Sequence, residues 1–107
     1  YIHVLDLAKG HVKALKTLEK KAQIITVNLG TGNGYSVLDI VNAFEVVSGR
    51  DVPYEIVDRR AGDIGQCYAD SSRAEKLLCW KAEYDLVEMC EDTWRWQLMN
   101  PEGYTIK

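Results

Sequence analysis

The sequence predicts an α/β fold in which a short sheet is packed by helices. Apolar residues at three- and four-residue spacing, typical of amphipathic helices, alternate with short β-branched runs, typical of buried strands. The chain has 107 residues, of which 47% are hydrophobic. That is enough for one modest core but too little for a full doubly wound sheet. We therefore expect a single domain that spans residues 1–107.

The first expected unit is a helix followed by a strand. Asp6 can cap the helix, which should run to about Lys21. Its apolar side chains recur on one face, while lysines keep to the others. These apolar residues are Leu7, Ala8, Val12, Leu15 and Leu18. The run from Ile24 to Leu29 is nearly all apolar, as a strand covered on both faces would be.

Residues 30–35 form a glycine-rich turn after this strand. A dinucleotide-binding loop also follows a strand and opens a helix. The spacing differs here, because Tyr35 stands where the third glycine of the G-x-G-x-x-G pattern belongs. We therefore interpret these residues as a structural turn in which one or more glycines adopt a positive φ.

The second half of the chain is expected to hold three helices and one strand. Ser36 and Asp39 have the spacing of a capping box, and the helix that they start should end at Gly49. The run from Val52 to Val57 is expected to be the second strand. The remaining helices are expected from Asp70 to Leu78 and from Asp85 to Pro101.

Composition narrows the classes of partner. A net charge of -3 and a pI of about 5.3 give no general attraction to nucleic acid or anionic lipid. No apolar run approaches the length of a membrane span. No two of the three cysteines, Cys67, Cys79 and Cys90, form a Cys-x-x-Cys pair, which argues against a zinc site and against a disulfide framework. We therefore expect a reducing, cytoplasmic setting. Because Tyr1 follows neither a Met nor a basic segment, we expect a piece of a longer protein without a signal peptide.

The segment Arg59-Arg60-Ala61-Gly62-Asp63 is the most informative part of the chain. Two neighbouring guanidiniums can hold a diphosphate with paired hydrogen bonds, and Asp63 can accept a hydrogen bond from a sugar hydroxyl. The alternative is a solvated loop in which the arginine and aspartate pair with each other. His3 and His11 have no Cys or carboxylate constellation around them in the sequence, so no metal site is expected.

Four motifs together resemble the C-terminal portion of the UDP-glucose 4-epimerase family, which belongs to the extended short-chain dehydrogenases/reductases. They occur in order and with matching spacing between Tyr1 and about Tyr104. The motifs are YIHVLDLAKGH at 1–11, NLGTGNGYSVL at 28–38, RRAGD at 59–63 and DTWRWQ at 92–97.

The resemblance implies that residues 1–107 are a small C-terminal substrate-binding domain of an enzyme with an NAD-dependent reaction. The 4-hydroxyl of a UDP-hexose is oxidised to a ketone, the sugar turns in its pocket, and hydride returns to the other face. Arg60 would hold the diphosphate and Asp63 the uridine ribose, while the backbone of Ala61 and Gly62 wraps the nucleotide. Tyr1 belongs to a phosphate-binding motif whose preceding Arg-Asp lies outside this chain. Cys67 would lie beside the sugar, where a small side chain leaves room for an N-acetyl group.

The resemblance also implies what this chain lacks. The family binds NAD in an upstream Rossmann domain and uses an upstream Tyr-x-x-x-Lys pair, and no tyrosine here has a lysine four residues later. We therefore expect no catalytic or cofactor-binding residue in this chain and no activity from it alone. The full-length protein is expected to be a cytoplasmic homodimer. The alternatives are a stand-alone nucleotide-binding or regulatory module, or another extended short-chain dehydrogenase/reductase, such as a dehydratase or decarboxylase.

Overall fold

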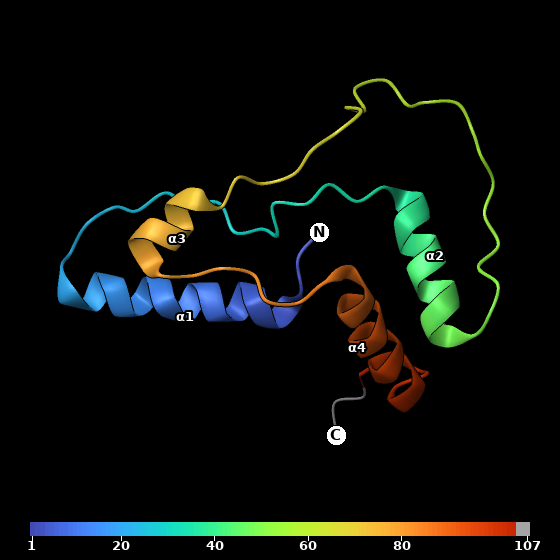
Figure 1. Cartoon of the computed structure of the whole chain (residues 1–107). Helices are drawn as coiled ribbons and strands as arrows, with labels where there is room; N and C mark the ends of the chain where they lie inside the picture. Colours follow the sequence, from blue (N-terminus) through green and yellow to red (C-terminus); the bar gives the residue numbers. More distant parts are fainter. Residues whose placement is uncertain (105–107) are drawn as a thin grey trace.

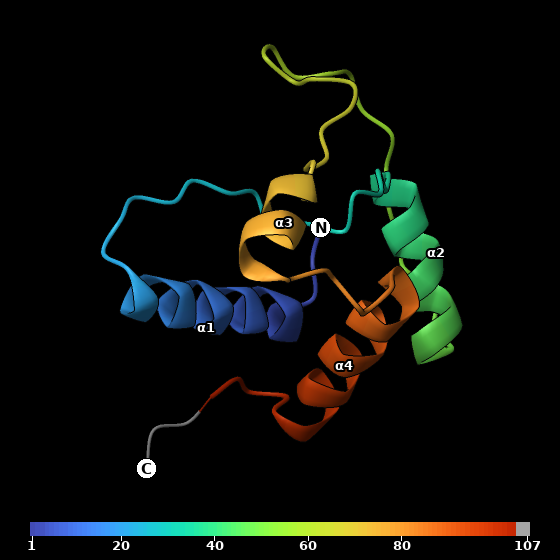
Figure 2. The same cartoon turned by 60° about the vertical axis from the view of Figure 1, so that its left-hand side comes forward.

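Four helices account for the regular structure of residues 1–104, the part of the chain that the computed structural model describes. They are arranged as two pairs: α3 packs at a steep angle on α1, and α2 packs against α4 (Figure 1). The bounds are α1 Val4–Lys20, α2 Val37–Ser48, α3 Ser72–Leu78 and α4 Leu86–Met99. Residues 49–71 connect the two pairs as an arch, whose middle stands away from the helices in both views (Figure 2).

The expected short sheet is not found in residues 1–104, and this part of the α/β prediction needs correction. Residues 24–29 run between α1 and α2, whereas residues 52–57 lie on the arch, and neither is a strand (Figure 1). A strand requires a neighbour with which to exchange backbone hydrogen bonds, and β-branched composition does not supply one. Ile24 is 98% exposed, whereas Ile25, Val27 and Leu29 are half-buried against the core, so only one side of this run is covered.

Three of the four helix starts agree with the sequence. Ser36 and Asp85 each form a complete capping box, with Asp39 and Glu88 respectively. The helix α2 ends as expected at Gly49, whose φ is 65°. The third start is that of α3, where Asp70 accepts a hydrogen bond from the backbone N–H of Ser72 at 2.9 Å.

The start of α1 differs from the expectation. The N-cap is His3, whose Nδ1 accepts the backbone N–H of Leu5 at 3.1 Å. Asp6 is not the cap but lies in the first turn, completely buried. Its Oδ2 accepts the backbone N–H groups of Glu83 at 2.9 Å and of Tyr84 at 3.0 Å. A buried carboxylate can thus bind a distant segment instead of its own helix.

The core of the described residues lies between α1 and α3. Trp80 is 1% exposed and packs with Ala74 and Leu78. Its indole Nε1–H donates to the backbone carbonyl of Asp6 at 3.0 Å, so the polar edge of the ring is also satisfied. Trp80 is therefore a central residue of this core.

The arrangement is more open than that of an ordinary domain of this size. The radius of gyration is 17.2 Å, whereas about 13 Å is typical of a compact domain of roughly 100 residues. Large apolar side chains of α1 remain exposed, among them Val4, Val12 and Leu15. The two helix pairs therefore leave much apolar surface uncovered.

Candidate substrate site

A cavity of about 600 Å³ joins three segments that are distant in the sequence. Tyr1 comes from the N-terminal segment, Gly34 to Asp39 from the start of α2, and Cys67 from the arch. Two of the residues predicted to contact substrate, Tyr1 and Cys67, therefore meet in one cavity, and both are exposed. The other lining residues are Tyr35, Ser36, Val37, Ile64, Gly65 and Gln66.

The glycine turn brings these walls together. A Cβ added to Gly30 would lie 2.6 Å from the Cβ of Ala69, and one added to Gly34 would lie 3.4 Å from Nε2 of Gln66. Gly30 is therefore needed for the close approach of the segment that carries Cys67, whereas a side chain at Gly34 would fit only tightly against Gln66. Gly32 has a φ of 77°, which confirms the expected structural turn at that position.

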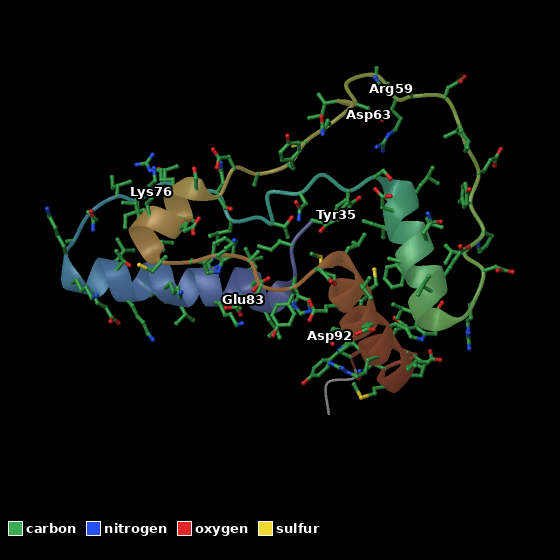
Figure 3. The ribbon with its side chains drawn as sticks, in the orientation of Figure 1. Tyr35, Arg59, Asp63, Lys76, Glu83 and Asp92 are labelled. Atoms are coloured by element: carbon green, nitrogen blue, oxygen red, sulfur yellow. The ribbon has the colours of Figure 1, made fainter. Side chains whose placement is uncertain are left out.

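The loop predicted to bind the diphosphate lies beside this cavity but does not line it. Arg60 and Asp63 form a bidentate ion pair, with Nε 3.2 Å from Oδ2 and Nη2 3.3 Å from Oδ1. The Arg60 side chain is 85% exposed, and Ala61 and Gly62 are also open to solvent. Figure 3 shows Asp63 on the arch, apart from Tyr35 at the start of α2. The observed contact is thus the arginine–aspartate pairing considered above as the alternative.

Tyr35 and Gln66 were missed by the sequence reasoning. Tyr35 was noted only because it breaks a glycine pattern, yet it is half-buried in the cavity wall, with its hydroxyl 3.4 Å from Nδ2 of Asn33. Gln66 precedes Cys67 and turns its amide toward Gly34. The available signals were that Tyr35 lies within the family motif at 28–38 and that Gln66 is the neighbour of Cys67.

The start of α2 contributes a fixed negative charge to the cavity. The backbone N–H and the hydroxyl of Ser36 both donate to Asp39, and these hydrogen bonds hold the pKa of the Asp39 carboxyl below its usual range. A carboxylate at a helix start offsets the positive end of the helix dipole. This wall therefore suits a hydroxyl or amide group better than a phosphate.

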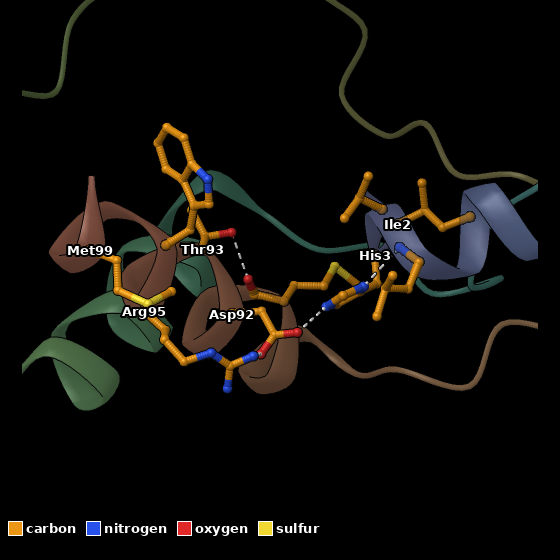
Figure 4. Close-up of a pocket in the computed structure, with 10 residues that line it drawn as sticks. Ile2, His3, Asp92, Thr93, Arg95 and Met99 are labelled. Atoms are coloured by element: carbon orange, nitrogen blue, oxygen red, sulfur yellow. Dashed lines mark hydrogen bonds and ion pairs between the residues drawn. The ribbon is translucent and has the colours of Figure 1, made fainter. Parts of the chain in front are cut away.

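A second cavity, of about 510 Å³, lies on the other side of the N-terminal segment, between residues 2–5 and α4 (Figure 4). Its lining is largely apolar and includes Ile2, Met89 and Trp96. The polar groups in it are His3, Asp92, Thr93 and Arg95. His3 Nε2 lies 3.2 Å from Oδ2 of Asp92, and Arg95 pairs with the other carboxylate oxygen.

No group of three or more His, Cys, Asp or Glu side chains among residues 1–104 has the geometry to hold a metal ion. No helix among these residues is long and apolar enough to cross a membrane.

Solved structures that resemble this chain indicate the class of protein to which it is related. A UDP-glucose 4-epimerase from Stenotrophomonas maltophila, solved with bound NAD and formylated UDP-arabinopyranose, superposes with a TM-score of 0.90 at 51% identity, covering 95% of this chain and 30% of that one. The UDP-Glc/GlcNAc 4-epimerase of Campylobacter jejuni gives a TM-score of 0.81 at 34% identity, over 92% of this chain and 30% of that one. The chain thus has the structure of a segment of nucleotide-sugar epimerases.

Sequence comparison gives the same answer. The UDP-glucose 4-epimerase of Drosophila melanogaster is 59% identical over 109 residues, which cover 100% of this chain and 31% of the relative. The Homo sapiens enzyme is 53% identical over 104 residues, or 97% of this chain and 30% of the relative. No protein-family profile matches the chain. The chain corresponds to the C-terminal part of UDP-glucose 4-epimerases and spans about a third of their length.

Proposed function

We propose that this chain is the UDP-sugar-binding portion of a UDP-glucose 4-epimerase. Such an enzyme interconverts UDP-galactose and UDP-glucose through a 4-keto intermediate and uses bound NAD to take up and return the hydride. The observation that carries the proposal is the meeting of Tyr1 and Cys67 in one cavity, beside the loop of Arg60 and Asp63. The 51% identity to a solved epimerase with NAD and a UDP-sugar supports it.

The open arrangement of the helices supports a role as part of a larger enzyme. We infer that the exposed apolar face of α1 packs against an upstream NAD-binding Rossmann domain. In that setting residues 24–29 and 52–57 would find the neighbouring strands that they lack here. NAD and the catalytic Tyr-x-x-x-Lys pair belong to that domain, so this chain contributes substrate binding only. A cytoplasmic homodimer remains part of the proposal.

Arg60 and Asp63 are proposed to form a clamp for UDP, and in the absence of the nucleotide they pair with each other. An exposed ion pair contributes only about 0 to 1 kcal/mol, whereas one hydrogen bond to a charged group contributes about 1.5 to 3 kcal/mol. Contacts with UDP can therefore replace the ion pair. Nε and Nη2 of Arg60 then donate hydrogen bonds to the diphosphate, and Asp63 accepts hydrogen bonds from the ribose hydroxyls. The backbone of Ala61 and Gly62 then follows the nucleotide.

The sugar lies, in this proposal, in the cavity next to Tyr1 and Cys67. The small Cys67 side chain leaves space that an aromatic residue would fill, so we propose that the N-acetylhexosamine pair is also accepted. The polar wall formed by Tyr35 and Ser36 can bind sugar hydroxyls, because both residues carry hydroxyl groups near the fixed charge of Asp39.

Calorimetric titration of the full-length protein with UDP tests the proposal. We expect saturable one-to-one binding per chain, and a full-length protein that does not bind UDP would contradict the proposed function. A stand-alone module is the weaker alternative, since the apolar surface of α1 would then stay exposed. An enzyme acting on another nucleotide sugar would bind UDP but fail to convert UDP-galactose.

A further inference from the structure

We propose that His3 is a positioning residue for the UDP-sugar site: it holds Tyr1 at the cavity wall by fastening the N-terminal segment to α4 through Asp92. The inference rests on the proposed function, because it assigns a role within the same site. It concerns a contact that lies outside the cavity of Tyr1 and Cys67, on the opposite side of the N-terminal segment.

Both ring nitrogens of His3 are engaged. Nδ1 accepts the backbone N–H of Leu5 at 3.1 Å, so it carries no proton. In the neutral ring the proton is therefore on Nε2, which lies 3.2 Å from Oδ2 of Asp92 and donates to it (Figure 4). One side chain thus caps α1 and, at its other end, binds α4.

The surroundings keep this ring in place. His3 is 3% exposed, and its ring stacks on Tyr84 with the centroids 4.2 Å apart. The backbone N–H of Tyr84 is in turn held by the buried carboxylate of Asp6. Arg95 pairs with the second oxygen of Asp92 and so orients that carboxylate toward the histidine. The contact is therefore supported from α1, from α4 and from the segment between α3 and α4.

The link matters for Tyr1 because little else holds that residue. Among the hydrogen bonds of residues 1–104, the His3–Asp92 bond is the one that joins the N-terminal segment to α4, and none involves Tyr1. Tyr1 lines the larger cavity, whereas Ile2 and His3 line the smaller one. The Cα atoms of Tyr1 and His3 can be no more than about 7 Å apart. Fixing His3 therefore restricts where the Tyr1 ring can lie.

Two substitutions of similar shape each keep one of the two hydrogen bonds of His3 and remove the other. His3→Asn places its side-chain oxygen near the position of Nδ1 and is a good N-cap, but it cannot reach Asp92. His3→Gln extends its amide N–H toward the position of Nε2 and gives up the cap. Asp92→Ala removes the partner, and Glu91→Ala is the matched control, because Glu91 is an exposed carboxylate on the same helix.

The experiment measures KM for UDP-galactose in the full-length enzyme carrying each substitution, together with the melting temperature. We expect His3→Asn and Asp92→Ala each to raise KM by about fivefold to tenfold, an effect of the size of one ordinary hydrogen bond, because Tyr1 is then held less firmly at the cavity wall. The double variant should raise KM no further. His3→Gln should melt at a lower temperature and keep KM within about twofold, and Glu91→Ala should change neither.

KM distinguishes positioning from a loss of folded protein. A smaller folded fraction lowers the apparent kcat but leaves KM unchanged, whereas a displaced Tyr1 raises KM. Unchanged KM in His3→Asn and Asp92→Ala would overturn the inference, as would KM effects of the two substitutions that simply multiply in the double variant. If the wild-type enzyme itself does not bind UDP in calorimetry, the proposed function fails first, so the two failures are distinguishable.

Discussion

Arg60 and Asp63 face each other across a single turn of the arch: Nε of Arg60 donates to Oδ2 of Asp63 at 3.2 Å, and Nη2 donates to Oδ1 at 3.3 Å. The backbone closes the same turn, since the N–H of Asp63 donates to the carbonyl of Arg60 at 3.2 Å. Gly62 has a φ of 89°, which permits this turn. The two groups that we assign to the diphosphate and the ribose are therefore already oriented as a unit.

Removing this guanidinium should weaken nucleotide binding. We expect Arg60→Ala in the full-length enzyme to reduce the free energy of UDP binding by about 2 to 4 kcal/mol, because two charge-assisted hydrogen bonds to the diphosphate are lost. Arg59→Ala is the matched control and should have a smaller effect. Calorimetric titration decides the matter: equal affinities of Arg60→Ala and wild type would remove the clamp assignment.

A larger side chain at position 67 should narrow the range of sugars. Cys67→Tyr is expected to cut turnover of UDP-N-acetylglucosamine by about an order of magnitude or more, because the added ring occupies the space of the N-acetyl group. Turnover of UDP-galactose should be largely spared. The measurement is the ratio of kcat/KM for the two sugars, and a parallel fall of both would mean that Cys67 does not gate the pocket.

The buried carboxylate of Asp6 should be a major contributor to stability. Asp6→Ala would leave the backbone N–H groups of Glu83 and Tyr84 without their acceptor in a partly buried site. We expect a loss of about 2 to 4 kcal/mol in the free energy of unfolding. Chemical denaturation of the full-length enzyme would measure it, with the exposed Asp58→Ala as control. A loss equal to that of the control would show that Asp6 does not hold the 83–84 segment.

Cys79 offers a stabilising substitution. It ends α3 in the left-handed region with a φ of 50°, where a side chain is strained and glycine is not. Cys79→Gly is expected to stabilise the protein by up to about 1 kcal/mol, while Cys79→Ala, which keeps a Cβ, should not. Thermal melting of the two variants provides the comparison, and equal melting temperatures would rule out strain at this position.

The sequence predicted local features better than distant contacts, and the helix caps show why. The capping boxes of Ser36 and Asp85 depend on residues within one turn, so their spacing is visible in the sequence. The role of Asp6 was mistaken, because its partners Glu83 and Tyr84 lie far along the chain. A carboxylate before a helical pattern has the same local signature in either role.

The candidate site shows the same division. The family motifs pointed to Tyr1 and Cys67, and the structure places both on one cavity. Tyr35 lies within the motif at 28–38 but had no role implied there, and Gln66 lies in none of the motifs; their place in the cavity emerges only when the arch packs on the glycine turn. The strands failed for a related reason, because sheet formation depends on partners that lie elsewhere than in the neighbouring sequence.

The most direct test of the account compares the full-length protein with this chain alone in one assay, the conversion of UDP-galactose to UDP-glucose with NAD present. We expect conversion by the full-length protein and none by residues 1–107, because substrate binding without the NAD domain and its Tyr-x-x-x-Lys pair cannot transfer hydride. Absence of conversion by a folded, NAD-loaded full-length protein would contradict the account, as would activity of the chain alone.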